Sequence, residues 1–405
     1  MMSALFSSNK RVISGMRASG RLHLGHYHGV IHNWLELQHQ FDCYFFVADW
    51  HGLTTRFDEP GVLEAAIWDM VVDWLAAGIN PSLSKVFIQS WVPEHAELHL
   101  LLSMITPLGW LERVPTYKDQ QEKLRDKDLA NYGFLGYPVL QSADVLLYKG
   151  QLVPVGEDQV SHIELTREIA RRFNHLYGRE TNFADLVQEA IKKMGKKNGK
   201  LYQNLRKQFQ QEGLQESLET AKALLANQHN LSISDKERLL GHLDGSGKII
   251  LPEPHPLLTK TAKMPGTDGQ KMSKSYHNTI TLRELPADVE RKILTMPTDP
   301  ARVKRTDKGT PEKCPVWQLH QVYSSNDVKD WASQGCTSAN IGCVDCKRPV
   351  IEAINAELKP IQTNIADLSA DMASVKQIVS EGSEAAREEA HKTLQEVKEV
   401  MGLDY

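Results

Sequence analysis

The sequence predicts an α/β fold, with a Rossmann-like domain around a parallel sheet, an inserted helical segment and an all-helical C-terminal region. Two observations lead to this prediction. Short apolar runs alternate with helical patterns in the first half of the chain, and helical patterns without such runs fill most of the rest. We therefore expect an α/β domain over residues 1–190, a helical insertion over 191–250, a loop region over 251–284 and a helical region over 285–405.

The predicted sheet has four strands, each a short apolar run. They cover residues 11–14, 43–48, 85–89 and 152–155. The second run is apolar throughout, as expected of a strand that is buried on both faces. Helical patterns lie between the runs, over residues 26–40, over 59–77 and through 144–148. Strands and helices that alternate at this spacing imply parallel strands joined by right-handed crossovers.

The composition indicates a water-soluble globular protein of two or three domains. The chain has 405 residues, of which 41% are hydrophobic and 24% charged. No apolar run approaches the roughly 20 residues that cross a bilayer. Residues 1–10 lack a secretory apolar stretch, so we expect a cytoplasmic protein with no membrane partner. Because the net charge is −4, a nucleic acid would have to bind a local basic patch.

A glycine-containing segment joins the first predicted strand to the first helix and ends in His23-Leu24-Gly25-His26. The carboxyl end of a strand is where open parallel sheets bind ligands. Glycine lets the backbone approach a nucleotide, and the start of a helix offers free N–H groups. His23 and His26 can therefore donate hydrogen bonds to a phosphate as charge builds on its oxygens. The alternative is a capped helix whose two histidines have structural partners.

A second motif, Lys271-Met272-Ser273-Lys274-Ser275, lies in a loop that also contains glycine. Two lysines and two hydroxyls suit a triphosphate and its departing pyrophosphate. By itself a short Lys/Ser run is usually a solvated loop. Together, the two motifs predict phosphate chemistry, with catalytic roles for His23, His26, Lys271 and Lys274.

The two motifs resemble the H-x-G-H and K-M-S-K-S hallmarks of class I aminoacyl-tRNA synthetases. Outside residues 191–250, most of the chain is similar to bacterial tryptophanyl-tRNA synthetases. The similar stretches are residues 14–20, 49–54, 87–92, 111–113, 137–148 and 153–166. The resemblance implies a homodimer that uses ATP and Mg²⁺ to convert L-tryptophan to tryptophanyl-AMP and then charges tRNA(Trp). One departure is that bacterial tryptophan enzymes often carry T-x-G-N at the first motif.

The resemblance also implies an ATP site. Its expected residues are Arg17, Ala18, Ser19, Gly25, His26, Gly156, Glu157, Asp158, Lys271, Met272, Ser273, Lys274 and Ser275. Since no protein nucleophile is implied, catalysis would consist of positioning and charge stabilisation.

A tryptophan site follows from the same resemblance. Asp144 matches the carboxylate that accepts the indole N–H, and a carboxylate suits an indole because the ring offers one donor and no acceptor. The structural alternative for Asp144 is a surface or ion-paired helical residue. The other expected pocket residues are Tyr137 and Gln159 at the α-amino end, His51 and Ile13 at the walls, and Gln141, where the family commonly has Met.

Three other interpretations share parts of this pattern. A tyrosyl-tRNA synthetase has the same architecture, but its phenol-binding pocket needs a second polar partner. A small-molecule adenylyltransferase shares H-x-G-H but normally lacks the second motif and a long helical C-terminal region. An iron–sulfur or RNA-binding regulator that has lost catalysis is the third alternative.

Four of the five cysteines lie within a short stretch, namely Cys314, Cys336, Cys343 and Cys346. In a cytosolic protein such a cluster holds a metal more often than it forms disulfides. Four thiolates suit zinc or a [4Fe–4S] cluster, and the spacing does not choose between them. The resemblance favours [4Fe–4S], because some bacterial tryptophanyl-tRNA synthetases carry such a cluster with nearly this spacing. Unligated thiols are the remaining alternative.

The predicted insertion begins with a basic stretch. Its lysines and arginines are Lys192, Lys193, Lys196, Lys197, Lys200, Arg206 and Lys207. Such a patch can contact phosphates, although a solvated helix face is the more ordinary interpretation. The resemblance does not extend to this segment.

Overall fold

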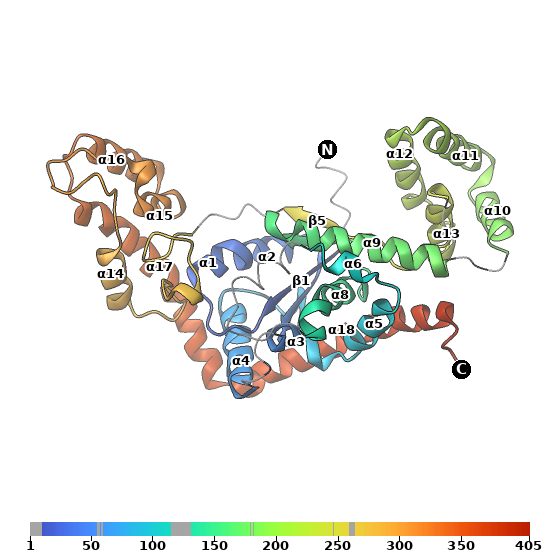
Figure 1. Cartoon of the computed structure of the whole chain (residues 1–405), viewed down its shortest axis with the longest axis horizontal. Helices are drawn as coiled ribbons and strands as arrows, with labels where there is room; N and C mark the ends of the chain where they lie inside the picture. The colour runs from blue at the N-terminus through green and yellow to red at the C-terminus, as the bar shows by residue number, and fades with distance from the viewer. Residues whose placement is uncertain are drawn as a thin grey trace. The chain divides into compact units, whose positions relative to one another are not determined.

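The structure, a computed structural model, describes residues 10–54, 57, 60–114, 131–178, 180, 182–245, 247–258 and 264–405. The chain forms two compact units. Figure 1 shows its helices and strands, coloured from the N-terminus to the C-terminus. The first unit comprises Met1–Trp91, Pro154–Glu157 and Leu257–Ala385, and the second comprises Val92–Val153, Asp158–Pro256 and Ala386–Tyr405. The expected boundaries at residues 190, 250 and 284 remain a prediction.

A five-stranded sheet has the order β3-β2-β1-β4-β5. Its strands are β1 (Arg11–Arg17), β2 (Asp42–Ala48), β3 (Ser84–Ile88), β4 (Leu152–Val155) and β5 (His255–Leu258). β2 pairs in parallel with both β1 and β3, with Tyr44 opposite Ile13 on one side and Lys85 on the other. β2 is buried from Cys43 to Ala48, as its continuous apolar run predicts. The α/β fold with a parallel sheet is therefore confirmed.

The edge strand β5 lies in a stretch for which the sequence predicts only a loop. It has four residues and contains Pro256, which cannot donate a hydrogen bond to a neighbouring strand and is tolerated at an edge. None of the four residues is fully buried. Because so short a strand shows no alternation of apolar and polar residues, its sequence pattern is that of a loop.

Helices precede or follow each strand along the chain. Those within the first unit are α1 (Leu24–His26), η1 (Tyr27–Ile31), α2 (His32–Leu37), α3 (Asp49–Leu53), α4 (Pro60–Ala76), η2 (Gln89–Trp91), η4 (Lys274–Tyr276), α14 (Pro286–Thr295), η5 (Pro311–Lys313), α15 (Pro315–Tyr323), α16 (Asn326–Thr337) and α17 (Cys343–Ala370). The predicted helix over 26–40 is thus three consecutive segments, of which η1 is a π-helical turn.

The second unit contains α5 (Glu94–Ser103), α6 (Leu108–Leu111), α8 (Tyr132–Leu146), α9 (Val160–Tyr177) and the four inserted helices. The turn η3 (Glu157–Gln159) and the last helix, α18 (Met372–Met401), have residues in both units. The helical C-terminal region is confirmed, and its last two helices, α17 and α18, are separated at Asp371. No helix among the described residues is both long and apolar enough to cross a membrane.

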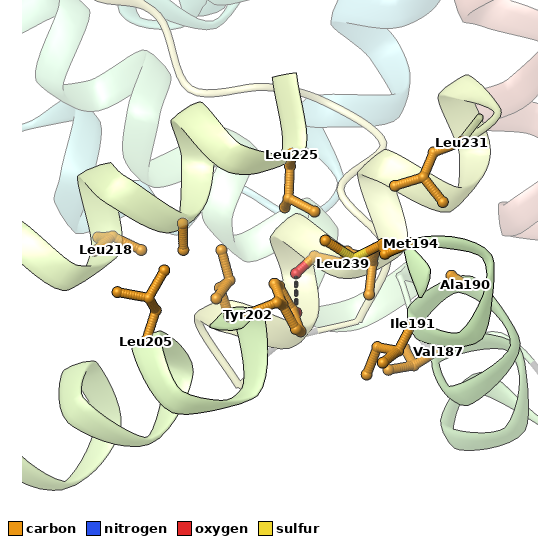
Figure 2. Packing of buried hydrophobic residues seen from close by; sticks show 12 residues of the cluster. Val187, Ala190, Ile191, Met194, Tyr202, Leu205, Leu218, Leu225, Leu231 and Leu239 are labelled. Atoms are coloured by element: carbon orange, nitrogen blue, oxygen red, sulfur yellow. Dashed lines mark hydrogen bonds between the residues drawn. The ribbon is translucent and has the colours of Figure 1, made fainter. Parts of the chain in front are cut away.

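The inserted helices are α10 (Phe183–Lys193), α11 (Gly195–Glu212), α12 (Gln215–Ala226) and α13 (Ile233–Leu243). They begin before the expected start of the insertion at residue 191. They enclose a core of their own, in which Val187, Leu225 and Leu239 lie around Tyr202 (Figure 2). The Tyr202 hydroxyl donates to the Leu239 carbonyl at 2.7 Å, so the one polar group at the centre of this core has a partner.

Candidate active site

The strand order directs attention to the residues that follow β1. β1 pairs with β2 on one side and with β4 on the other, and open parallel sheets generally bind ligands beyond the carboxyl ends of the strands at such a reversal of strand order. The segments that follow β1 and β4 are Ala18-Ser19-Gly20 and Gly156-Glu157, which include predicted ATP-site residues. Gly20 has a φ of +96°, which side chains disfavour, so the turn after β1 requires glycine.

His23 and His26 open the helical run that follows this turn. Their rings stack with centroids 3.7 Å apart, and the His23 backbone N–H donates to His26 Nδ1 at 3.4 Å. His26 therefore has a structural partner, as expected if the two histidines only cap the helix. However, His23 Nδ1 is buried and has no hydrogen-bond partner among the described residues. An unpaired buried nitrogen calls for an explanation, and a ligand at this position supplies one.

Burial and a nearby cation keep both imidazoles neutral. Burial, and next the charge of Lys274, lowers the pKa of His23 to about 4. Burial, followed by the charges of His23 and Lys274, lowers the pKa of His26 well below its usual value of 6.5. At neutral pH each ring can donate one N–H without adding charge. The positive charge at this position is therefore that of the lysine.

Lys274 joins the second motif to the turn after β1. Its Nζ donates to the carbonyls of Ser19 and Gly20 at 3.1 and 2.8 Å. Gly25 of the first motif also lies beside Met272 of the second: a Cβ on Gly25 would be 3.6 Å from Met272 Cβ, an ordinary contact, and 3.0 Å from the His23 ring, which is tight. The structure thus brings the two predicted phosphate motifs together within the first unit. Lys271 and Ser275, from the same motif, are exposed.

A residue that the sequence analysis did not select holds the second motif in shape. Asn278 is 1% exposed, and its side chain accepts from the Ser273 N–H at 2.7 Å and donates to the Lys271 carbonyl at 3.1 Å. A Cβ on Gly266 would lie 2.2 Å from the Asn278 side chain, so glycine is required opposite it. A single Asn after the motif gives no signal in the sequence.

A buried ion pair, also missed from the sequence, fixes the backbone beside both motifs. Asp73 on α4 has no exposed surface, and it accepts from the Leu22 N–H at 3.1 Å and from Arg283 Nε at 2.8 Å. Leu22 directly precedes the first motif, and Arg283 follows the second. Backbone hydrogen bonds also join residues 22–24 to 280–282. The only available sequence signal was a carboxylate on an otherwise apolar stretch of helix.

In the second unit, Asp144 belongs to a buried polar network. Its Oδ1 lies 2.7 Å from His95 Nδ1, and His95 Nε2 lies 2.7 Å from the Tyr148 hydroxyl. Asp144 is 2% exposed and the other two are fully buried. An ionised carboxylate only accepts, so His95 Nδ1 donates its N–H to Asp144. Asp144 is therefore a buried, oriented group and not a surface residue.

The other predicted pocket residues are divided between the two units. Tyr137 is buried on α8, and its hydroxyl lies 3.4 Å from His162 Nε2. Gln141 is half-buried on the same helix, one turn before Asp144. The others are Gln159, half-buried in the second unit, and Ile13 and His51, buried in the first. Their expected contacts with tryptophan remain predictions.

The four clustered cysteines are all described and are free thiols. Burial, followed by the charges of Cys314, Cys336 and Cys343, raises the pKa of Cys346 to about 12, so the four sulfurs influence one another. Two of them have other partners: the Arg302 guanidinium lies 3.7 Å from Cys336 Sγ, and His320 Nε2 lies 3.3 Å from Cys346 Sγ. Within the described parts of the chain, no three or more His, Cys, Asp or Glu side chains form a group that could hold a metal ion. This arrangement does not support the expected cluster.

Histidines, a lysine and a glycine turn that lie together after the first strand of a parallel sheet are typical of nucleotide-binding α/β enzymes. The family model described as tRNA synthetases class I (W and Y) matches residues 7–213 and 214–359. The chain therefore belongs to the class I aminoacyl-tRNA synthetases, as the resemblance implies. The match includes all of residues 191–250, to which the resemblance did not extend.

The individual relatives within this family that are most relevant here are tryptophan-specific enzymes. The chain is 58% identical to the tryptophan–tRNA ligase of Ralstonia nicotianae, over 98% of this chain and 99% of the relative. It is 42% identical to that of Thermotoga maritima, over 97% and 99% of the two chains. A crystal structure of tryptophanyl-tRNA synthetase from Campylobacter jejuni, complexed with ADP and tryptophan, is 26% identical with a TM-score of 0.72, over 97% and 100% of the two chains.

Proposed function

We propose that this chain is a tryptophan–tRNA ligase. It activates L-tryptophan with ATP to give tryptophanyl-AMP and pyrophosphate, and then transfers the tryptophanyl group to tRNA(Trp). The observation that carries the proposal is the contact between Lys274 and the Ser19–Gly20 turn beside the two neutral histidines. High identity to tryptophan–tRNA ligases over nearly the whole chain supports the choice of amino acid.

In the first step, the tryptophan carboxylate attacks the α-phosphate of ATP and pyrophosphate leaves. We assign His23 and His26 to hydrogen bonding with the phosphates, because neutral rings donate without repelling Lys274. Lys274 and the more exposed Lys271 stabilise the charge that develops on the leaving pyrophosphate. Mg²⁺ carried by the phosphates would supply further charge neutralisation. The rest of the assigned ATP site is Arg17, Ala18, Ser19, Gly25, Gly156, Glu157, Asp158, Met272, Ser273 and Ser275.

The amino acid is selected by Asp144. Its carboxylate accepts the indole N–H, and the buried contact with His95 keeps it in place. A ligand without that N–H would leave a buried carboxylate partly unsatisfied, which makes the wrong ligand costly. We assign Tyr137, Gln141 and Gln159 to the same pocket, together with Ile13 and His51.

Pyrophosphate exchange with purified protein tests this function. Tryptophan should support exchange, and tyrosine should not, because a phenol offers a donor and an acceptor where an indole offers only a donor. Aminoacylation of tRNA(Trp) transcript then tests the second step. Exchange with tyrosine alone would make the chain a tyrosyl-tRNA synthetase, and exchange without any tRNA charging would favour an adenylyltransferase.

We also propose that Cys314, Cys336, Cys343 and Cys346 hold a [4Fe–4S] cluster. The support is the clustering of four cysteines within a short stretch of the sequence and the family resemblance. The described side chains do not form a metal-binding group, which counts against the cluster. A direct analysis for iron and zinc decides between the two. Anaerobically purified protein should show iron and a brown visible absorption. Colourless protein with zinc, or with no metal, would overturn this assignment.

We further propose a cytoplasmic homodimer, as the family resemblance implies. Light scattering coupled to size exclusion should give twice the 45.7 kDa of one chain. A mass equal to one chain would reject the dimer.

A further inference from the structure

The inserted helices carry a concentrated positive charge in an acidic protein. Residues 192–207 contain seven Lys and Arg and no Asp or Glu, whereas the whole chain has a net charge of −4. This stretch covers the end of α10 and most of α11. The function proposed above leaves it unexplained, because the predicted ATP and tryptophan residues lie elsewhere in the chain.

The core of the insertion sets the direction in which α11 presents these residues. Gly199, Tyr202 and Leu205 are buried on one side of α11. Figure 2 shows Tyr202 and Leu205 in the core of the insertion. At 100° per residue, positions 196, 200 and 207 fall together on another side, and all three are exposed lysines. They span about 16 Å along the helix axis. We call Lys196, Lys197, Lys200 and Lys207, with Lys192 at the end of α10, the basic face of the insertion.

A tight turn brings the two parts of the basic face together. A single residue, Met194, separates α10 from α11. Gly195, the first residue of α11, has a φ of +78°, which favours glycine. A Cβ on Gly199 would lie 3.1 Å from both the Ile191 side chain and its carbonyl, so the start of α11 packs closely on the end of α10. Lys192 and Lys196 are therefore held near each other by the backbone.

The basic face has no acidic partners in the described structure. Two other basic residues of the stretch are used internally: Lys193 pairs with Asp235 at 2.9 Å, and Arg206 donates to the His242 carbonyl at 2.7 Å. The five lysines of the basic face make no hydrogen bond or ion pair with any described residue. By contrast, two exposed basic residues elsewhere in the second unit have acidic partners, namely Arg171 with Glu253 and Lys222 with Glu219.

This arrangement is unfavourable for the isolated chain. Lys196 and Lys200 are like charges at i and i+4, which repel. Lys196 and Lys197 also lie in the first turn of α11, which has no acidic residue, and cations there oppose the helix dipole. A polyanion that binds the basic face would relieve both effects.

We propose that the basic face binds the phosphate backbone of RNA, and in this protein the backbone of the tRNA substrate. Lysines that act as point charges suit phosphates, and protein–protein interfaces are depleted in lysine. The apolar side of α11 is already buried in the core of the insertion, so a membrane would find no apolar face to bind. The identity of the RNA rests on the proposed function, but the phosphate-binding surface does not.

The test compares two double variants of the full chain that remove the same charge from the same insertion. One is Lys196→Gln with Lys200→Gln, on the basic face. The control is Lys222→Gln with Lys236→Gln, whose lysines contact Glu219 and the Ala226 carbonyl. Binding of tRNA transcript is measured by fluorescence anisotropy over a range of salt concentrations, and tryptophan-dependent pyrophosphate exchange is measured without tRNA.

The basic-face variant should bind tRNA about 5- to 50-fold more weakly, with a salt dependence that falls by about one unit of slope for each lysine removed. Its pyrophosphate exchange should equal that of the parent. Replacing the same two lysines by Arg should preserve binding, which separates lost charge from misfolding. If the two double variants bound tRNA with the same affinity and the same dependence of affinity on salt concentration, the proposal would be overturned. Absence of pyrophosphate exchange in the parent would instead refute the proposed function and leave the binding comparison valid.

Discussion

The candidate phosphate motifs of the first unit, called the phosphate side below, and the network around Asp144 in the second unit, called the amino-acid side, are built differently. In the first unit, Lys274 and two neutral histidines meet at a glycine turn, and backbone contacts together with the buried Asp73 fix their positions. In the second unit, Asp144 is itself the buried group, and side chains of His95 and Tyr148 hold it. The phosphate side thus combines a rigid frame with a long, half-buried cation. On the amino-acid side, the group that we propose to select tryptophan lies inside the core.

This difference matches the chemistry of each half. A triphosphate changes its charge distribution during the reaction, and a flexible ammonium group can follow that change. An indole keeps its single donor throughout, so a fixed acceptor discriminates best. Substitutions on the two sides should therefore affect different measurements.

The largest effect is expected from the frame of the phosphate side. Asp73→Asn removes the buried charge that holds Arg283 and the Leu22 N–H, and should lower the free energy of unfolding by about 3–5 kcal/mol. The measurement is urea unfolding. Asp69→Asn is the matched control, because Asp69 pairs with the same arginine at 2.8 Å but is 31% exposed. Equal losses in the two variants would show that burial of Asp73 does not matter.

The cation should affect rate with little change in stability. Lys274→Ala should lower kcat for tryptophan-dependent pyrophosphate exchange about 100- to 1000-fold, because a charge-stabilising donor is lost. Its unfolding should stay close to that of the parent, since the side chain is half-buried. Lys222→Ala, an exposed lysine of the insertion, is the control. A loss of less than about threefold in Lys274→Ala would remove this residue from the reaction.

The amino-acid side should change selectivity. His95→Leu removes the group that holds Asp144 and should lower kcat/KM for tryptophan about 10- to 100-fold, as expected for a hydrogen bond to a charged group. The benzothiophene analogue of tryptophan, which lacks the ring N–H, should be affected much less. Tyr148→Phe, one step further from Asp144, should show a smaller change in the same direction. Equal losses for both substrates would mean that His95 supports only the fold.

The smallest effect is a pH dependence of stability on the phosphate side. The pKa of His23 is about 4 in the folded chain and 6.5 in the unfolded one, so the unfolded state binds more protons between these values. The free energy of unfolding should therefore fall as the pH drops from about 6.5 to about 4. His23→Gln should flatten this fall by about 2 kcal/mol. His39→Gln, at an exposed position after α2, should not, and an unchanged slope in His23→Gln would contradict the neutral-histidine interpretation.

The sequence predicted most of the strands because buried parallel strands are short, continuous apolar runs. β4 was predicted to the residue, whereas β5 was missed because its four residues carry no periodicity. The His23 and Lys274 motifs were visible because phosphate binding needs particular residue types at fixed spacing. Asn278, Asp73 and His95 were not, since a lone polar residue in a sequence does not reveal whether it is buried or what it contacts.

The sequence by itself determined the fold class, the family and the two phosphate motifs, because local patterns of apolar residues and glycine fix where strands end and helices begin. Only the tertiary structure decided that Lys274 reaches a turn 255 positions away, that both histidines are neutral and that Asp144 is held by His95. It also decided which lysines of the insertion are already paired and which form the basic face. These facts depend on burial and on contacts between distant segments, which no local pattern encodes.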